Sequence, residues 1–265
     1  MINNKKVAIV TGGAGFIGSH MVDLLISKNY QVRIVDNLSG GHKKNLKHCL
    51  KNRNLHFKKI DICKLKKNDN FFKNVDYVFH FAGIGDIVPS IERPADYMKN
   101  NVQGTIKVLE ASRYAKVKKF VYAASASCYG KTKRLTDEKY RISLEHPYAL
   151  SKYLGEQSVM HWNRVYGLPS NSIRIFNAYG PRVRTTGAYG AVIGVFFKQK
   201  IEKKPLTIVG DGKQSRDFVY VTDVAKAFFA ASKSKYNGKI YNVGTGKPQT
   251  VNYLAKLIGG KKIFI

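Results

Sequence analysis

A glycine-rich turn directly after the first strand-like segment constrains the fold of this chain more than any other feature. Residues 7–11 are an apolar run typical of a buried strand, and glycines follow at positions 12, 15 and 18. This spacing allows a tight turn, close approach of a pyrophosphate and close packing of the next helix, whose positive end then faces the phosphates. We therefore expect a dinucleotide site that includes Gly12, Gly15, Phe16, Ile17 and Gly18.

Strand-like and helical segments alternate along the first two-thirds of the chain. Apolar runs predict strands at residues 7–11, 31–36, 55–61, 77–82, 119–124 and 172–176, and helices are expected at 18–28, 94–114 and 147–166. This βαβ alternation predicts an α/β fold, a Rossmann-type doubly wound parallel sheet with helices on both faces. Beyond residue 176 the pattern loosens, with a helix expected at 195–202, a strand-like run at 206–209 and a helix at 223–232 that returns to the sheet.

Two domains of unequal size are expected. The 265 residues are enough for one sizeable α/β unit and a small appendage. We expect residues 1–176, joined by 218–245, to form the dinucleotide-binding Rossmann domain. Residues 177–217 and 246–265 are expected to form a small substrate-binding lobe.

The formal net charge of +29 is unusual, since the chain has 46 lysines and arginines and only 17 acidic residues. A nucleic-acid-binding protein concentrates such charge on one face beside stacking aromatic residues. Here the lysines are spread over many short stretches, so nucleic acid is not an expected partner. No apolar run approaches the roughly 20 residues that span a bilayer, and the first residues lack a signal-peptide pattern. With three cysteines in no Cys-x-x-Cys pair, we expect a cytoplasmic protein without a membrane or metal partner.

Asp36 lies at the end of the second expected strand and predicts which dinucleotide binds. A carboxylate there accepts hydrogen bonds from the adenosine ribose and repels a 2′-phosphate, which favours NAD over NADP. Arg33 and the Lys43–Lys44 pair nearby leave NADP open.

Two further strand ends are candidate cofactor contacts. Asp61 and Ile62 close the third strand, where they could meet the adenine edge, although a solvated strand-end aspartate is nearly as good an interpretation. Phe81, Ala82 and Gly83 follow the fourth strand, where small residues let the backbone approach the cofactor. We expect the preceding residue, His80, to be a buried structural histidine and not a catalytic base.

Tyr148 and Lys152 are the candidate chemical groups. Residues four apart on a helix share a face, and both fall on the helix expected at 147–166. A free tyrosine is too weak an acid to act as a base near neutrality, but a nearby ammonium and a positive nicotinamide would favour its phenolate. Ser125, just beyond the fifth strand, offers a hydroxyl that can orient or share the moving proton. These three residues predict hydride chemistry beside a nicotinamide.

Taken together, these motifs resemble the extended short-chain dehydrogenase/reductase family, and within it the nucleotide-sugar epimerases similar to UDP-glucose 4-epimerase. The resemblance runs from residue 7 to about residue 258. It is carried by the motifs at 11–18, 36–38, 80–83, 100–102, 125–130, 148–152, 174–182, 210–217 and 241–244.

The resemblance implies roles for further residues. Asn37, Asn100 and Phe176 are expected at the cofactor, and Lys152 at the nicotinamide ribose. Asn177 and Arg216 are expected to contact the nucleotide sugar together with Ser125 and Tyr148, Arg216 as a fork for its diphosphate. A homodimer through the helices near 100–114 and 148–165 is implied by the family only.

The resemblance also implies a reaction: Tyr148 takes a proton from a sugar hydroxyl while NAD takes a hydride, and the hydride returns to the other face of a 4-keto sugar. The dehydratases and decarboxylases of this family carry carboxylates after the hydroxyl residue, whereas Ser125 is followed here by Ala126 and Ser127. This favours C4 epimerisation over dehydration. A 4-reductase, or a non-catalytic basic protein that binds a dinucleotide, stays open. Because family members usually continue past the position of Ile265, we expect an incomplete substrate lobe.

Overall fold

A seven-stranded parallel sheet forms the centre of the computed structural model, which describes residues 5–132, 135–183 and 192–265. The strand order is β11-β6-β5-β4-β1-β2-β3. The order reverses between β1 and β4, as in doubly wound sheets, so the predicted fold class is confirmed. The strands are β1 (Val7–Thr11), β2 (Gln31–Asp36), β3 (Leu55–Lys59), β4 (Tyr77–His80), β5 (Lys119–Ser125), β6 (Ser170–Ile175) and β11 (Lys239–Val243).

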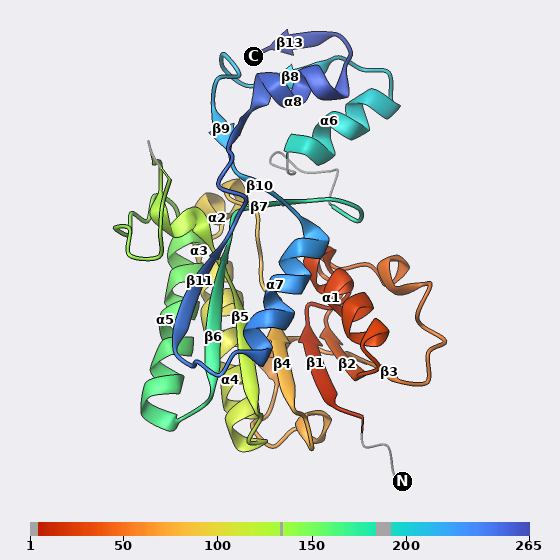
Figure 1. The fold of residues 1–265 in the computed structure, drawn as a ribbon, viewed down its shortest axis with the longest axis vertical. Helices are drawn as coiled ribbons and strands as arrows, with labels where there is room; N and C mark the ends of the chain where they lie inside the picture. The colour runs from red at the N-terminus through yellow and green to blue at the C-terminus, as the bar shows by residue number, and fades with distance from the viewer. Residues whose placement is uncertain (1–4, 133–134, 184–191) are drawn as a thin grey trace.

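Helices cover both faces of this sheet (Figure 1). One face carries α1 (Phe16–Ser27) and α7 (Val221–Lys233), and the other carries α4 (Gly104–Tyr114) and α5 (Pro147–Tyr166). Successive strand residues point to opposite faces of the sheet and pack into two separate hydrophobic cores. Val10 belongs to the core with Met21 and Phe228, and Ile9 belongs to the core with Val108. Because both faces of β1, β4 and β5 are buried, these inner strands read as mostly apolar runs, whereas the outer strands β3 and β11 are partly exposed.

The helix expected at residues 94–114 is interrupted. It consists of α3 (Pro94–Tyr97), a π-helical segment η4 (Met98–Gln103) and α4, and it is preceded by a short helix α2 (Val88–Glu92) that the sequence did not suggest. A π-helical turn widens the helix locally and is often found at functional sites. It changes which side chains face the sheet, a shift that sequence periodicity cannot reveal.

Two strands end earlier than expected. Strand β3 stops at Lys59, since Asp61 accepts a hydrogen bond from Cys63 N at 2.8 Å and begins the short helix η2 (Ile62–Lys64). Strand β4 stops at His80, and the chain then turns above β1. The remaining short helices are η1 (Lys43–Leu46), η3 (Asn70–Phe72) and η5 (Ala126–Tyr129).

A smaller group of elements lies above the carboxyl ends of the strands (Figure 1). Helices α6 (Val192–Ile201) and α8 (Val251–Ile258) pack with the parallel pair β8 (Leu206–Ile208) and β13 (Lys262–Phe264) around a third core. Two further pairs connect this group to the sheet: β7 (Asn177–Tyr179) with β10 (Phe218–Tyr220), and β9 (Ser215–Arg216) with β12 (Gln249–Thr250). The domain limits at residues 176, 217 and 245 stay predictions.

Within the described residues, no helix combines the length and the apolar character needed to cross a membrane.

Candidate active site

The site lies where the strand order reverses, at the carboxyl ends of β1 and β4. Thr11 and His80 are register partners at the ends of these two strands. In open α/β sheets this switch point leaves a crevice in which ligands bind. The turn after β1 and the turn after β4 touch, since a Cβ on Gly12 would lie 2.7 Å from Ala82 N.

The glycine turn has the geometry that a pyrophosphate requires. Gly12 has φ +68°, and its amide donates to the Val35 carbonyl at 2.8 Å. Gly15 N donates to the Gly12 carbonyl at 3.0 Å, and a Cβ on Gly18 would collide with that same carbonyl oxygen. Gly15 is the N-cap of α1 and offers no side chain, so the first amides of α1, from Phe16 onward, face outward for an anion. These residues fit a dinucleotide.

Asp36 lies directly beside this turn. It is buried, and its two carboxylate oxygens accept from Ala14 N at 2.9 Å and Leu38 N at 2.7 Å. Asn37 faces its own loop, where Oδ1 accepts from the amide and the hydroxyl of Ser39. Arg33 is committed elsewhere: Nη1 donates to the carbonyls of Phe71 and Lys73. It is therefore not free for a 2′-phosphate, which strengthens the preference for NAD.

Several residues expected at the adenine and the ribose have side chains that are already engaged in contacts within the protein. Asp61 keeps one carboxylate oxygen on Cys63 N, and the Ile62 side chain packs against Gly104, so only its backbone is available. Phe81 likewise offers only its backbone, because its ring lies 4.5 Å from that of Phe228 in the core. Gly83 has φ +156°, and a Cβ there would meet Asn101 Oδ1.

Asn101, which the sequence analysis did not assign to the cofactor, lies beside the loop after β4. It is buried, and its side chain hydrogen-bonds both backbone groups of Ile84. The Asn100 amide instead donates to the Asp96 carbonyl of its own helix at 2.8 Å. Both asparagines lie in the π-helical segment η4, and the expected role of Asn100 at the cofactor stays a prediction.

Ser125 and Tyr148 come together from two different elements. Ser125 ends β5, and Tyr148 lies in the first turn of α5, which His146 caps by accepting from Ala149 N at 3.1 Å. The two hydroxyls hydrogen-bond each other. Burial raises the pKa of Tyr148, and its hydrogen bond with Ser125 opposes that rise. In the protein alone Tyr148 is therefore held as the neutral phenol.

Lys152 lies on the same face of α5, buried below Tyr148. Its Nζ is 4.5 Å from the centre of the Tyr122 ring, a cation–π distance. Burial lowers the pKa of Lys152 to about 7, although the Glu156 carboxylate opposes this. The structure thus brings the predicted triad together, while the expected lowering of the Tyr148 pKa by Lys152 stays a prediction.

Ser127 is a second hydroxyl that the sequence analysis did not assign. Its amide and its Oγ both donate to Ser125 Oγ, at 3.2 and 2.9 Å. Because Ser125 Oγ accepts these two bonds, its own proton is directed toward Tyr148 and the crevice. The Ser-Ala-Ser spacing was the available signal.

The residues expected at the nucleotide sugar lie where the chain crosses toward α6 and α8. Phe176 follows β6, and its ring lies 6.4 Å from that of Tyr129. Asn177 donates through Nδ2 to the Asp217 carbonyl at 3.1 Å. Arg216 is exposed on β9, where Nη1 donates to the carbonyl of Ser215 at 2.8 Å. An exposed guanidinium at this crossing is accessible to an anionic ligand.

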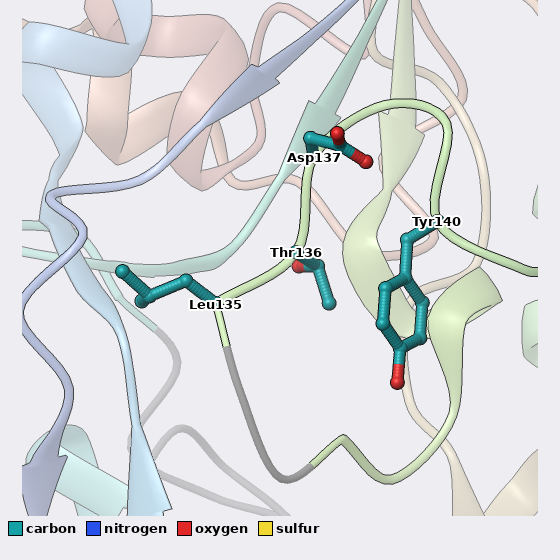
Figure 2. A pocket seen from close by; sticks show the side chains of 4 residues that line it. All are labelled: Leu135, Thr136, Asp137 and Tyr140. Atoms are coloured by element: carbon teal, nitrogen blue, oxygen red, sulfur yellow. The ribbon is translucent and has the colours of Figure 1, made fainter.

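A pocket of about 380 Å³ opens beside the segment that follows the Ser125 turn. Figure 2 shows four side chains of the described residues that line it, Leu135, Thr136, Asp137 and Tyr140. None of the predicted site residues lines this pocket. The Tyr140 ring stands edge-on to Tyr129 at 6.1 Å, which links the pocket to the back of the Ser125 turn.

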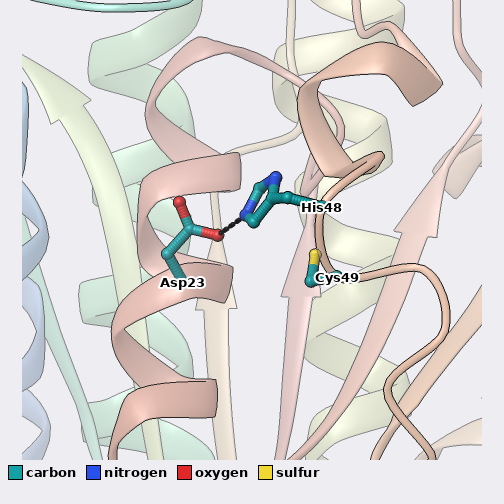
Figure 3. Close-up of side chains that lie close together, drawn as sticks. All are labelled: Asp23, His48 and Cys49. Carbon is teal, nitrogen blue, oxygen red and sulfur yellow. Dashed lines mark hydrogen bonds and ion pairs between the residues drawn. The ribbon is translucent and has the colours of Figure 1, made fainter.

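Asp23, His48 and Cys49 gather on the outer side of α1 (Figure 3), with potential ligand atoms within 4.8 Å of one another. His48 Nε2 lies 2.7 Å from Asp23 Oδ1, and Arg182 Nη1 lies 2.8 Å from Oδ2. The Arg182 guanidinium therefore already pairs with this carboxylate, and His48 hydrogen-bonds it. With His20, whose Nε2 is 3.0 Å from the Pro181 carbonyl, the group ties α1 to residues 181–182, a structural role.

Comparison with known proteins agrees with this geometry. The family model for the NAD dependent epimerase/dehydratase family matches residues 8–244. The chain is 42% identical over 253 residues to a putative UDP-glucose 4-epimerase of Methanocaldococcus jannaschii, covering 94% of this chain and 80% of that protein. It is 34% identical over 260 residues to a UDP-N-acetyl-alpha-D-glucosaminuronate decarboxylase of Bacillus cytotoxicus, covering 95% and 79%.

Solved structures show the same fold. The UDP-N-acetylglucosamine 4-epimerase from Methanobrevibacter ruminantium, in complex with UDP-N-acetylmuramic acid, superposes with a TM-score of 0.93 at 34% identity, over 99% of this chain and 85% of that one. The Thermus thermophilus UDP-glucose 4-epimerase complex with NAD gives 0.87 at 31% identity, over 98% and 85%. The chain belongs to the NAD-dependent epimerase/dehydratase family, and NAD is its cofactor, as the sequence predicted.

Proposed function

We propose that this protein is an NAD-dependent epimerase that inverts C4 of a nucleotide sugar of the UDP-glucose/UDP-galactose type through a 4-keto intermediate. The observation that carries the proposal is the turn Ser125-Ala126-Ser127, which places two hydroxyls and no carboxylate next to Tyr148. Epimerase relatives and the epimerase structures support the same conclusion.

Each residue of the triad has a role in this reaction. Tyr148, once ionised, removes the proton from the sugar hydroxyl at C4 and later returns it. Ser125 donates to the sugar oxygen, because Ser127 already fills its acceptor sites. Lys152, as an ammonium, lowers the pKa of Tyr148 and holds the nicotinamide ribose. NAD, when bound, would supply the hydride acceptor and donor for C4, so no external oxidant would be needed.

One observation favours a second candidate, a dehydratase or decarboxylase of the same family. Asp86, on the loop after β4, acts electrostatically on Tyr148 and raises its pKa, although burial has the larger effect. A carboxylate near the sugar is the group that a second proton transfer requires. One relative is itself a decarboxylase. Epimerisation is preferred because Asp86 is not on the Ser125 turn.

The assay that decides is incubation with UDP-glucose, UDP-galactose, their N-acetyl forms and UDP-glucuronate. Conversion at C4 without net NADH supports the epimerase. A 4-keto-6-deoxy product would assign a dehydratase, loss of carbon dioxide a decarboxylase, and a reduced sugar formed at the expense of added NADH a 4-reductase. Tyr148→Phe should abolish turnover and leave NAD bound. Tyr236→Phe, an exposed tyrosine outside the site, is the matched control.

A non-catalytic role is also open to experiment. The charge of +29 motivates it, and a shift of duplex DNA that persists at physiological salt, with no turnover of any nucleotide sugar, would support it. The absence of a nucleic-acid partner and the cytoplasmic location stay predictions.

We further propose a homodimer through α4 and α5. Exposed apolar side chains lie on these helices, with Leu150 at 36%, Leu154 at 37% and Tyr114 at 60% exposure. Leu150 and Leu154 are one turn apart on α5, so they form a continuous strip. Leu150→Glu with Leu154→Glu should give a monomer by light scattering, whereas Leu257→Glu, on α8, should not. A wild-type monomer at micromolar concentration contradicts the dimer.

A further inference from the structure

A buried ion pair lies directly behind the catalytic turn. Arg174 Nη2 lies 2.6 Å from Glu156 Oε1, and the two side chains are only 3% and 1% exposed. Arg174 Nε also donates to both carboxylate oxygens, at 3.2 and 3.0 Å. Taking two charges out of water costs as much as such a pair returns, and apolar replacements are often equally stable. Stability alone therefore does not account for the pair.

The guanidinium of Arg174 holds the far end of the Ser125 turn. Its Nη1 donates to Tyr129 Oη at 2.8 Å and to the Glu138 carbonyl at 3.3 Å. Tyr129 in turn donates to Asn242 Oδ1 at 2.7 Å, and Asn242 N donates to Glu138 Oε1 at 2.7 Å. In the sheet, Arg174 is the register partner of Ala124, next to Ser125. One side chain thus fixes η5 and the segment at 138 against β6 and β11.

The carboxylate of Glu156 holds the other half of the triad. Glu156 lies one helical turn after Lys152 and two turns after Tyr148 on α5, so the three share a face. Its Oε2 also accepts from Ser172 Oγ at 3.1 Å, which satisfies the carboxylate on the β6 side. The two segments that carry the triad, the Ser125 turn and α5, are therefore connected through Glu156 and Arg174.

We propose that Glu156 and Arg174 are positioning residues for proton transfer, which fix the Ser125 turn against the Tyr148–Lys152 face of α5 and keep a negative charge one turn from Lys152. This proposal rests on the proposed function for its catalytic consequence, but its structural part can be tested without a sugar.

The charge of Glu156 acts on Lys152. Burial lowers the pKa of Lys152 to about 7, and Glu156 opposes that effect. Removing the carboxylate leaves less ammonium at neutral pH, and the Tyr148 phenolate then forms only at higher pH. Two other ionisable side chains face Lys152: His80 on β4, whose pKa is lowered by burial and by the Lys152 charge, and Tyr122 on β5, whose ring lies against its ammonium. Asp86 and Cys128 act on Tyr148, and Tyr129 and Cys128 act on Arg174. His80 is neutral near pH 7, because burial lowers its pKa to about 3.

The test replaces the pair by apolar residues of similar volume, Glu156→Leu with Arg174→Met. The NAD complex of this double variant is compared with wild type by circular dichroism, NAD affinity and the ultraviolet titration of Tyr148, taken as the difference from Tyr148→Phe in the same background. We expect a folded protein whose Kd for NAD stays within about threefold, a Tyr148 titration moved up by about one pH unit, and a kcat for the sugar lowered roughly 30-fold at similar KM.

A matched control removes the ion pair between Lys58 on β3 and Asp69, the N-cap of η3, away from the site. Lys58→Met with Asp69→Asn should leave the Tyr148 titration and kcat unchanged. A folded Glu156→Leu/Arg174→Met protein with wild-type titration and kcat would overturn the proposal. If that variant does not fold, Glu156→Asp decides: a shorter side chain should lower kcat roughly tenfold with little shift in titration, and wild-type kcat would overturn the positioning role.

These outcomes separate the two proposals. If wild-type protein turns over none of the sugars, the epimerase assignment fails. The Tyr148 titration still reports whether the pair acts on the triad.

Discussion

Asn101 hydrogen-bonds both backbone groups of Ile84, its Oδ1 accepting from the amide at 2.8 Å and its Nδ2 donating to the carbonyl at 3.0 Å. The same Nδ2 donates to Ser151 Oγ at 2.9 Å, between Tyr148 and Lys152 on α5. One buried amide in the π-helical segment η4 therefore joins the cofactor-side loop after β4 to the catalytic helix.

Asn101→Ala should weaken NAD binding. The substitution leaves a part-buried donor and acceptor of Ile84 without their side-chain partner, at a cost of up to about 1–3 kcal/mol for each group. The loop at Gly83 and Ile84 then loses its fixed position beside the glycine turn. We expect the Kd for NAD, measured by calorimetry, to rise at least about tenfold, with a lower thermal midpoint.

The neighbouring asparagine is the control. Asn100 bonds only its own helix, through the Asp96 carbonyl, so Asn100→Ala should change the Kd for NAD by no more than about twofold. A raised Kd for NAD in Asn100→Ala, with an unchanged Kd in Asn101→Ala, would mean that the family-based assignment of Asn100 holds and that the Asn101 contacts have no role in NAD binding.

Asp36 should set the preference for NAD over NADP. Its carboxylate is held by Ala14 N and Leu38 N next to the glycine turn, where a 2′-phosphate would bring further negative charge. We expect NADP to bind at least about 100-fold more weakly than NAD, a difference of roughly 3 kcal/mol. Asp36→Asn should narrow the ratio, mainly by improving NADP binding. A wild-type ratio of the Kd for NADP to the Kd for NAD near one would contradict this role. It would favour the alternative in which Lys43 and Lys44 bind the 2′-phosphate of NADP.

The sequence predicted the inner strands well because they are buried on both faces, but it did not predict β11, which is partly exposed at the edge of the sheet. Continuous apolar runs such as Val7–Thr11 and Lys119–Ser125 can be recognised without knowing their neighbours. The glycine turn was equally readable, since Gly12 and Gly18 are required by backbone geometry that only glycine supplies.

What the sequence could not show depends on tertiary contacts. Asn100 and Asn101 make different contacts within a π-helical segment, which leaves no periodic signal in the sequence. Phe81 could not be placed in the core without knowing that Phe228, far along the chain, returns beside it. The Glu156–Arg174 pair was likewise hidden, because an isolated glutamate and arginine ordinarily indicate solvated surface.

Ser127 should raise the rate of the reaction without affecting binding. Its hydroxyl donates to Ser125 Oγ at 2.9 Å and directs the Ser125 proton toward the crevice. Ser127→Ala should therefore lower kcat about tenfold at nearly unchanged KM, whereas Ser127→Thr, which keeps the hydroxyl, should recover most of the rate. Steady-state kinetics with the preferred nucleotide sugar measure this. A raised KM with normal kcat would show instead that Ser127 binds the substrate directly.

His80 forms the centre of a hydrogen-bonded chain between β1, β4 and α4. Its Nδ1 lies 2.5 Å from Thr11 Oγ1, and its Nε2 lies 2.9 Å from Thr105 Oγ1. Thr105 donates to the Asn101 carbonyl at 2.7 Å, so we assign the proton of neutral His80 to Nε2, with Nδ1 accepting from Thr11. The expectation of a buried structural histidine is confirmed, since its side chain has no exposed surface.

This histidine should make the fold sensitive to acid. Burial lowers the pKa of His80 from 6.5 to about 3. Between these two pH values the unfolded chain therefore binds a proton at this histidine, and the folded protein does not. Stability should therefore be lost as pH falls from about 6.5 to about 3, by about 1.4 kcal/mol per pKa unit at most. Urea unfolding at a series of pH values measures the slope of the free energy of unfolding against pH.

His80→Gln, which keeps a donor and an acceptor, should be less stable at pH 7 but show a shallower slope. The exposed His56→Gln should follow wild type. Equal slopes for His80→Gln and wild type would mean that other groups cause the acid sensitivity.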